Sequence, residues 1–104
     1  MKKEEELITE FKVYLVETGY SEYTPSHYPS TAYDYCKRVE RVCLREGISV
    51  TRLYNSEILS IVAKYDIYGS EAEFGAKSHR AYINALKRFL SFKEFNDGKR
   101  MDPQ

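Results

Sequence analysis

The apolar residues of this chain recur at intervals of three and four positions, which is the spacing of one face of an α-helix. Between about residues 4 and 18, this face holds five large apolar side chains: Leu7, Ile8, Phe11, Tyr14 and Leu15. The glutamates at its start suit the positive end of a helix dipole. Gly19 can end the helix in a left-handed turn. The pattern therefore predicts a first helix that ends at about Thr18.

A second helical pattern follows a loop over residues 19–30, which contains two prolines. Ser30 or Thr31 can cap this helix, and Gly47 can end it. Its apolar face consists of Ala32, Tyr35, Cys36, Val39, Val42 and Cys43. Two cysteines on one helix at this separation lie roughly 10 Å apart, too far for a disulfide. They also lack a zinc-binding spacing with either histidine, so we expect two small core residues.

Two further helices are predicted in the second half of the chain. Asn55 or Ser56 is expected to cap a third helix, with four inward side chains: Ile58, Leu59, Val62 and Tyr65. The connection that contains Gly69 and Gly75 can hold a short turn. The last helix is expected over about 78–95, with five inward side chains: Tyr82, Ile83, Leu86, Phe89 and Leu90.

No segment alternates apolar and polar residues as a half-buried strand does. The sequence therefore predicts an all-α protein, a small four-helix bundle over residues 1–97. Residues 98–104 are expected to form a tail or the start of a linker.

The composition agrees with a single globular domain. The chain has 104 residues, of which 31% are charged, and this length can bury one core without a metal or a disulfide. No apolar run approaches the ~18–20 residues that cross a membrane. The charged N-terminus is not followed by an apolar secretory segment. We therefore expect a cytoplasmic protein that needs no cofactor.

The formal net charge is zero, but the charges are unevenly distributed. Residues 1–10 carry two lysines and four glutamates, whereas residues 77–93 carry five basic residues and no acidic one. The outward face of the last helix is expected to present Lys77, Arg80, Asn84, Lys87 and Arg88. One flank of the second helix presents Lys37, Arg38, Arg41 and Arg45. A solvated surface explains either face alone, but two such faces on one small bundle favour a polyanionic partner.

Motifs of enzymatic chemistry are missing from the sequence. It contains no glycine-rich phosphate loop, no HExxH motif and no carboxylates clustered at metal-binding spacing. His27 in the proline-containing loop and His79 near the start of the last helix are expected to be ordinary surface or partly buried residues. We expect no catalysis by this chain alone.

Three stretches of the sequence resemble helices of a known domain family. STAYDYCKRVERVCLREGIS, which begins at Ser30, has Thr31, then Tyr35 four residues later, and Gly47 at its end. It resembles the second helix of the core-binding domain, the N-terminal SAM-like domain, of tyrosine recombinases and phage integrases. FKVYLVETGYS over 11–21 is similar to the first helix of that family. AYINALKRFLSF over 81–92 is similar to its last helix, and Asp102-Pro103 lies near where such domains pass into a linker.

The resemblance implies a SAM-like orthogonal bundle that forms half of a clamp on duplex DNA. Its second and fourth helices would face the major groove, and these carry the two basic faces described above. The family's catalytic arginines, histidine and tyrosine belong to a separate C-terminal domain, so none of the ten tyrosines here inherits that role. The chain would then be a non-catalytic, monomeric domain of a site-specific recombinase, with duplex DNA and integrase subunits as partners.

Two other functions fit the same sequence. An orphan helical protein–protein interaction module of a phage or mobile element could use the acidic start of the first helix to meet a basic partner. A repressor with a helix-turn-helix-like domain would be expected to form a stable dimer.

Overall fold

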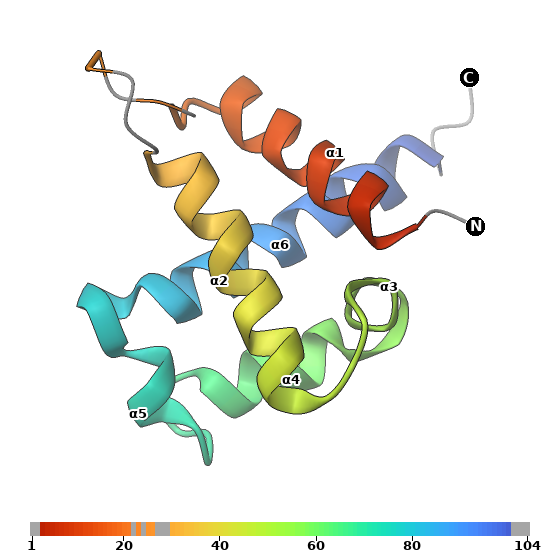
Figure 1. Cartoon of the computed structure of the whole chain (residues 1–104). Coiled ribbons are helices and arrows are strands. Elements are labelled where there is room, and N and C mark those ends of the chain that lie inside the picture. The colour runs from red at the N-terminus through yellow and green to blue at the C-terminus, as the bar shows by residue number, and fades with distance from the viewer. Residues whose placement is uncertain (1–2, 22, 24, 27–29, 101–104) are drawn as a thin grey trace.

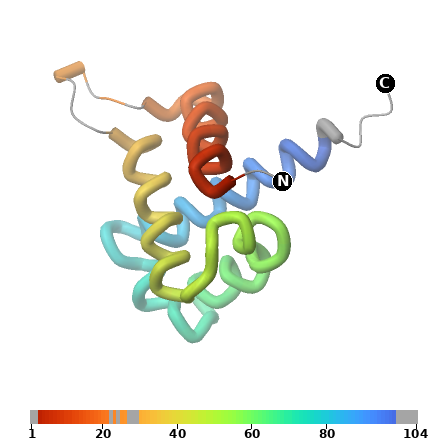
Figure 2. Tube along the Cα trace, turned by 45° about the vertical axis from the view of Figure 1, so that its right-hand side comes forward, coloured from red at the N-terminus to blue at the C-terminus, as the bar shows by residue number. Residues whose placement is uncertain are grey.

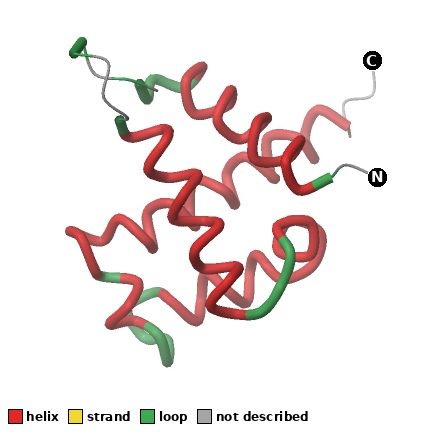
Figure 3. Tube along the Cα trace, viewed as in Figure 1, coloured by secondary structure: helices red, strands yellow, loops and turns green. Residues whose placement is uncertain are grey.

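The computed structural model describes residues 3–21, 23, 25–26 and 30–100, with the side chains of the last two left out. Two long helices come first, α1 (Glu4–Glu17) and α2 (Thr31–Glu46). Next come α3 (Val50–Arg52), a π-helical turn η1 (Leu53–Glu57) and α4 (Ile58–Tyr65). The short α5 (Ala72–Gly75) precedes α6 (Lys77–Arg100). No β-strand occurs among the described residues (Figure 3), which confirms the predicted all-α class.

Helix α6 is the element against which the others pack. It crosses behind α1 and α2 in Figure 1 and contacts both of them, as well as η1, α4 and α5. The turned view in Figure 2 shows the same crossing, with α3 and α5 on opposite sides of α2. The predicted ends of the first two helices are confirmed, because Gly19 and Gly47 both adopt positive φ angles.

An aromatic cluster joins α1, η1 and α6. The rings of Phe11 and Phe89 meet edge to face, with their centroids 5.0 Å apart. Phe92 lies 5.6 Å from Phe11, and Tyr54 of η1 lies 6.0 Å from Phe89. Both Phe11 and Phe89 are completely buried. Each such pair contributes about 0.5–1.5 kcal/mol beyond the burial of its surface, so this cluster fixes the position of α6.

The third helical segment begins earlier than predicted. Ser49, and not Asn55 or Ser56, is its cap, because the Ser49 hydroxyl accepts a hydrogen bond from the Arg52 N–H at 3.0 Å. The π-helical turn η1 then adds a residue to one turn and rotates the inward face of α4. As a result Leu59, predicted to be inward, is 69% exposed. Ile61 is buried in its place.

The start of the last helix also differs from the prediction. Ser78, His79 and Arg80 have left-handed backbone angles, with φ of 56°, 58° and 65°. The right-handed part of α6 therefore begins at Ala81. A left-handed conformation costs roughly 1–2 kcal/mol for each non-glycine residue, so tertiary contacts must hold this turn.

The far end of α6 extends beyond the predicted limit at Phe95. It continues to Arg100, so the first residues of the predicted tail over 98–104 are helical. Residues 101–104, including Asp102-Pro103, lie outside the described residues.

Both cysteines are core residues, as the sequence predicts. Cys36 and Cys43 are buried on α2. Burial disfavours the thiolate and raises the pKa of Cys43 to about 12. Neither cysteine forms a disulfide.

None of the helices in the described part of the chain combines the length and the apolar character required to cross a bilayer.

The carboxylate of Glu46, at the end of α2, links that helix to α4 by hydrogen bonds. Glu46 accepts a hydrogen bond from the Tyr65 hydroxyl at 2.6 Å and another from the Lys64 ammonium at 2.8 Å. Burial works to raise the pKa of Glu46, but these two donors and the nearby positive charges outweigh it and lower the pKa. Burial and the Glu46 carboxylate together raise the pKa of Tyr65 to about 12. Folding therefore favours the ionised glutamate and the neutral tyrosine.

The aromatic cluster is tested by Phe89→Ala, which leaves a cavity between α1, η1 and α6. We expect the free energy of unfolding, measured in urea, to fall by about 3–5 kcal/mol. Leu44→Ala is the control, because Leu44 is 80% exposed and its truncation should change stability by about 0.5 kcal/mol at most. A similar loss in both variants would contradict the assignment of the core.

The contact of Glu46 is tested by Glu46→Gln, which keeps the size of the side chain and removes its charge. At pH 7 we expect the free energy of unfolding to fall by about 1–2 kcal/mol. Because the folded pKa is lowered, the stabilisation is complete above the ordinary glutamate pKa of about 4.3 and is lost as pH falls through the folded value. Urea unfolding from pH 7 to pH 3 should therefore show the two proteins converging in acid. A constant difference at every pH would contradict this account.

Candidate nucleic-acid interface

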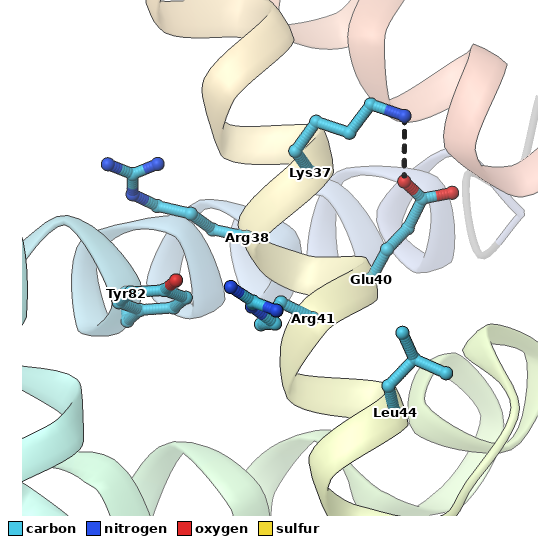
Figure 4. A pocket seen from close by; sticks show the side chains of 6 residues that line it. All are labelled: Lys37, Arg38, Glu40, Arg41, Leu44 and Tyr82. Atoms are coloured by element: carbon cyan, nitrogen blue, oxygen red, sulfur yellow. Dashed lines mark ion pairs between the residues drawn. The ribbon is translucent and has the colours of Figure 1, made fainter.

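Two adjoining hollows lie on the side of α2 that faces α5 and the start of α6. Figure 4 shows the first, which is lined by Lys37, Arg38, Glu40, Arg41, Leu44 and Tyr82. The second is lined by Arg41, Leu44, Arg45, Phe74, Lys77 and Tyr82. Because three residues line both hollows, we treat them as one surface, called here the basic groove.

The basic groove has an aromatic floor. The rings of Phe74 from α5 and Tyr82 from α6 lie with their centroids 4.5 Å apart. Gly75 permits this position of α5, since a Cβ atom there would stand 2.0 Å from the Tyr65 carbonyl oxygen. The floor therefore depends on close packing of α5 against the end of α4.

Cations lie over the faces of both rings. The Arg38 guanidinium is 5.2 Å from the centroid of Tyr82. Arg45 and Lys77 lie 4.0 Å and 5.0 Å from the centroid of Phe74. Such contacts contribute about 0.5–2 kcal/mol and orient the side chains that make them.

Carboxylates pair with only two of the five basic residues that line the basic groove. Glu40 pairs with Lys37 at 3.7 Å, and Glu71 pairs with Arg45. The remaining three, Arg38, Arg41 and Lys77, have no carboxylate partner among the described residues. In Figure 4, Lys37 reaches toward Glu40, whereas Arg38 and Arg41 lie on the side of α2 where Tyr82 is drawn. The basic groove therefore carries three positive charges that no described carboxylate neutralises.

Two of the basic residues predicted on the last helix are paired elsewhere. Asp66, directly after α4, lies 3.6 Å from Arg80 and 3.2 Å from Lys87. The N–H of Ile67 and the Lys87 ammonium lower the pKa of Asp66. On this face, Arg80 and Lys87 are therefore opposed by a carboxylate that comes from another element. Arg80 belongs to the left-handed turn, so Asp66 also holds that turn.

Two more of the predicted residues of α6, Arg88 and Asn84, do not line the basic groove either. Burial and Tyr20 together raise the pKa of Tyr35 on α2. The positive charge of Arg88, which lies nearby, opposes this rise. Asn84 is half-buried on α6. Of the nine residues predicted to contact DNA, the structure brings five together: Lys37, Arg38, Arg41, Arg45 and Lys77.

The sequence does not identify the floor of the groove. Its periodicity places Tyr82 in the core, and Phe74 lies in a connection to which no periodicity can be assigned. The one available signal is an aromatic residue shortly before Lys77 in an otherwise polar, glycine-containing stretch.

No histidine is among the described residues that line the basic groove. His79 is exposed in the left-handed turn, and His27 lies outside the described residues. No group of three or more histidine, cysteine, aspartate or glutamate side chains that could hold a metal ion occurs within the described ranges.

Comparison of the chain with protein families, with curated proteins and with solved structures found no match.

The role of Asp66 is tested by Asp66→Asn, which removes the charge opposite Arg80 and Lys87. The Arg80 amide donates to the Ala76 carbonyl at 2.9 Å within the turn, so its hydrogen exchange reports on the turn. We expect faster exchange of this amide at pH 6 in the variant. Asp97→Asn is the matched control, because Asp97 pairs with Lys93 further along α6. Unchanged exchange in Asp66→Asn would show that other contacts hold the turn.

Proposed function

We propose that this chain is a DNA-binding domain that contacts the phosphates of duplex DNA through the basic groove. The observation that carries the proposal is that Arg38, Arg41 and Lys77, from two helices, line one groove and have no carboxylate partner among the described residues. A surface that concentrates unpaired cations is suited to a polyanion, whose bound counterions are released on binding.

The shape of α2 supports duplex DNA as that polyanion. An α-helix fits the major groove, which is about 12 Å wide. Helix α2 has 16 residues and carries four of the five cations of the basic groove along one flank. Because the net charge of the whole chain is zero, we expect weak binding with a strong dependence on salt.

We further propose that the domain is the core-binding part of a site-specific tyrosine recombinase. The support is the resemblance of the sequences of α1, α2 and α6 to that family, together with the position of the basic groove between α2 and the start of α6. In this proposal the chain forms half of a clamp on DNA, with integrase subunits as further partners. It binds DNA without cutting it, since strand exchange would belong to a separate domain.

The structure changes which residues we propose as contacts. We propose Arg38, Arg41 and Lys77 as direct contacts to DNA, with Lys37 and Arg45 at the edge of the interface. Arg80 and Lys87 are given a structural role instead, because both already face Asp66.

The proposal is tested by titrating labelled duplex DNA into Arg41→Gln and the wild type at several salt concentrations. We expect weaker binding to all sequences and a salt slope reduced by about one, as for the loss of one phosphate contact. Arg52→Gln is the matched control, because Arg52 lies in α3 on the other side of α2 and pairs with Glu57. Equal weakening by both substitutions would indicate a general charge effect and contradict the assigned interface.

One observation favours a protein-interaction module as a second candidate function. Ile67 and Tyr68, in the turn between α4 and α5, are 60% and 96% exposed, and neither lines the basic groove. A module of this kind would dock its partner through that turn. Tyr68→Ala would then abolish partner binding while Arg41→Gln left it intact, the reverse of the result expected for DNA.

A further inference from the structure

We infer that Arg38 reads a guanine base in the major groove, with Tyr82 as the residue that positions it. This inference rests on the proposed function and concerns the same surface, but it assigns one side chain to sequence recognition. The remaining unpaired cations of the basic groove are assigned to the phosphate backbone.

The choice of Arg38 follows from comparing the three cations that lie over the aromatic floor. Arg45 is already paired with Glu71, so one of its terminal nitrogens is committed and its charge is partly neutralised. Lys77 ends in a compact ammonium group, which lacks the planar fork needed for two parallel hydrogen bonds. Arg38 alone among these three combines such a fork with the absence of a carboxylate partner in the described structure.

The geometry of Arg38 restricts how its guanidinium can be used. Its Nε atom is buried and has no hydrogen-bond partner among the described residues. With Nε buried, the two terminal nitrogens remain as the donors that a ligand can reach. Figure 4 shows them at the far end of the side chain, away from the axis of α2.

A guanine edge matches this arrangement. In the major groove, guanine presents O6 and N7 as two adjacent acceptors, and a bidentate arginine is the commonest specific contact to them. The cation–π contact with Tyr82 restrains the guanidinium before DNA arrives, so less side-chain freedom is lost on binding. Base reading depends on such fixed geometry, whereas a phosphate tolerates a mobile cation.

Arg41 provides the internal comparison. It is exposed on the same helix and has no ring contact or carboxylate partner among the described residues. Nothing in the described structure fixes the plane of its guanidinium. It is therefore suited to a phosphate, a contact that carries no sequence information.

The experiment begins by selecting preferred sites from a pool of random duplexes with the wild-type chain. Each guanine of the preferred site is then replaced by 7-deazaguanine, which lacks the N7 acceptor. A complete bidentate base contact contributes roughly 5- to 150-fold, and removing N7 leaves O6, so we expect one such replacement to weaken wild-type binding by roughly 5-fold or more within that range.

Three variants separate the roles. Arg38→Lys keeps the charge but removes the fork, so it should bind every sequence with similar affinity and ignore the 7-deazaguanine replacement. Arg41→Gln should bind all sites more weakly while keeping the guanine preference. Tyr82→Leu should reduce the preference, whereas Tyr82→Phe, which retains the ring, should preserve it.

The possible failures are distinguishable. If Arg38→Lys keeps the guanine preference, or if the wild type binds duplexes without any preference, the inference is overturned and the proposed function stands. If an N7 replacement has no effect while Arg38→Lys weakens all sites equally, Arg38 contacts a phosphate and the inference is wrong. If the wild type binds no duplex at low salt, both the inference and the proposed function fail.

Discussion

The edge-to-face contact between Phe11 and Phe89 is the interaction on which the rest of this structure depends. It holds α1 against α6 at the centre of the core, and Phe92 and Tyr54 extend the same cluster to η1. Since α6 contacts almost every other helix, its position determines where the others can pack. Tyr82, near the start of its right-handed part, is thereby placed beside α2 and α5. The basic groove is therefore a consequence of how the core is packed.

Electrostatics then decides which cations of this surface remain available. The chain has equal numbers of acidic and basic residues, so its binding properties depend on their positions. Asp66 and Glu71 each lie opposite a cation of another element, a pairing that spacing along one helix does not show. The cations left over are concentrated where α2 meets the start of α6. A protein with zero net charge can in this way present a basic surface.

Sequence periodicity predicted the fold class, the first two helices and most of the core, because these depend on spacing along one helix. It failed at Leu59, since the π-helical turn that rotates α4 has no signature in the spacing of apolar residues. It also failed at Ser78–Arg80, where contacts from another element hold a left-handed turn that these residue types do not favour. The pairing of Asp66 with Lys87 and the position of Phe74 depend on tertiary packing. Spacing along the chain therefore could not divide the basic residues into paired and unpaired ones.

The central claim is that the surface between α2 and the start of α6 binds duplex DNA. Titrating short duplex DNA into isotope-labelled protein at low salt, with the backbone amide shifts followed by NMR, tests it most directly. The account predicts shifts concentrated in residues 37–45 and 74–82, weakening as salt is added. Shifts confined to α1, or no shifts at all at low salt, would contradict it.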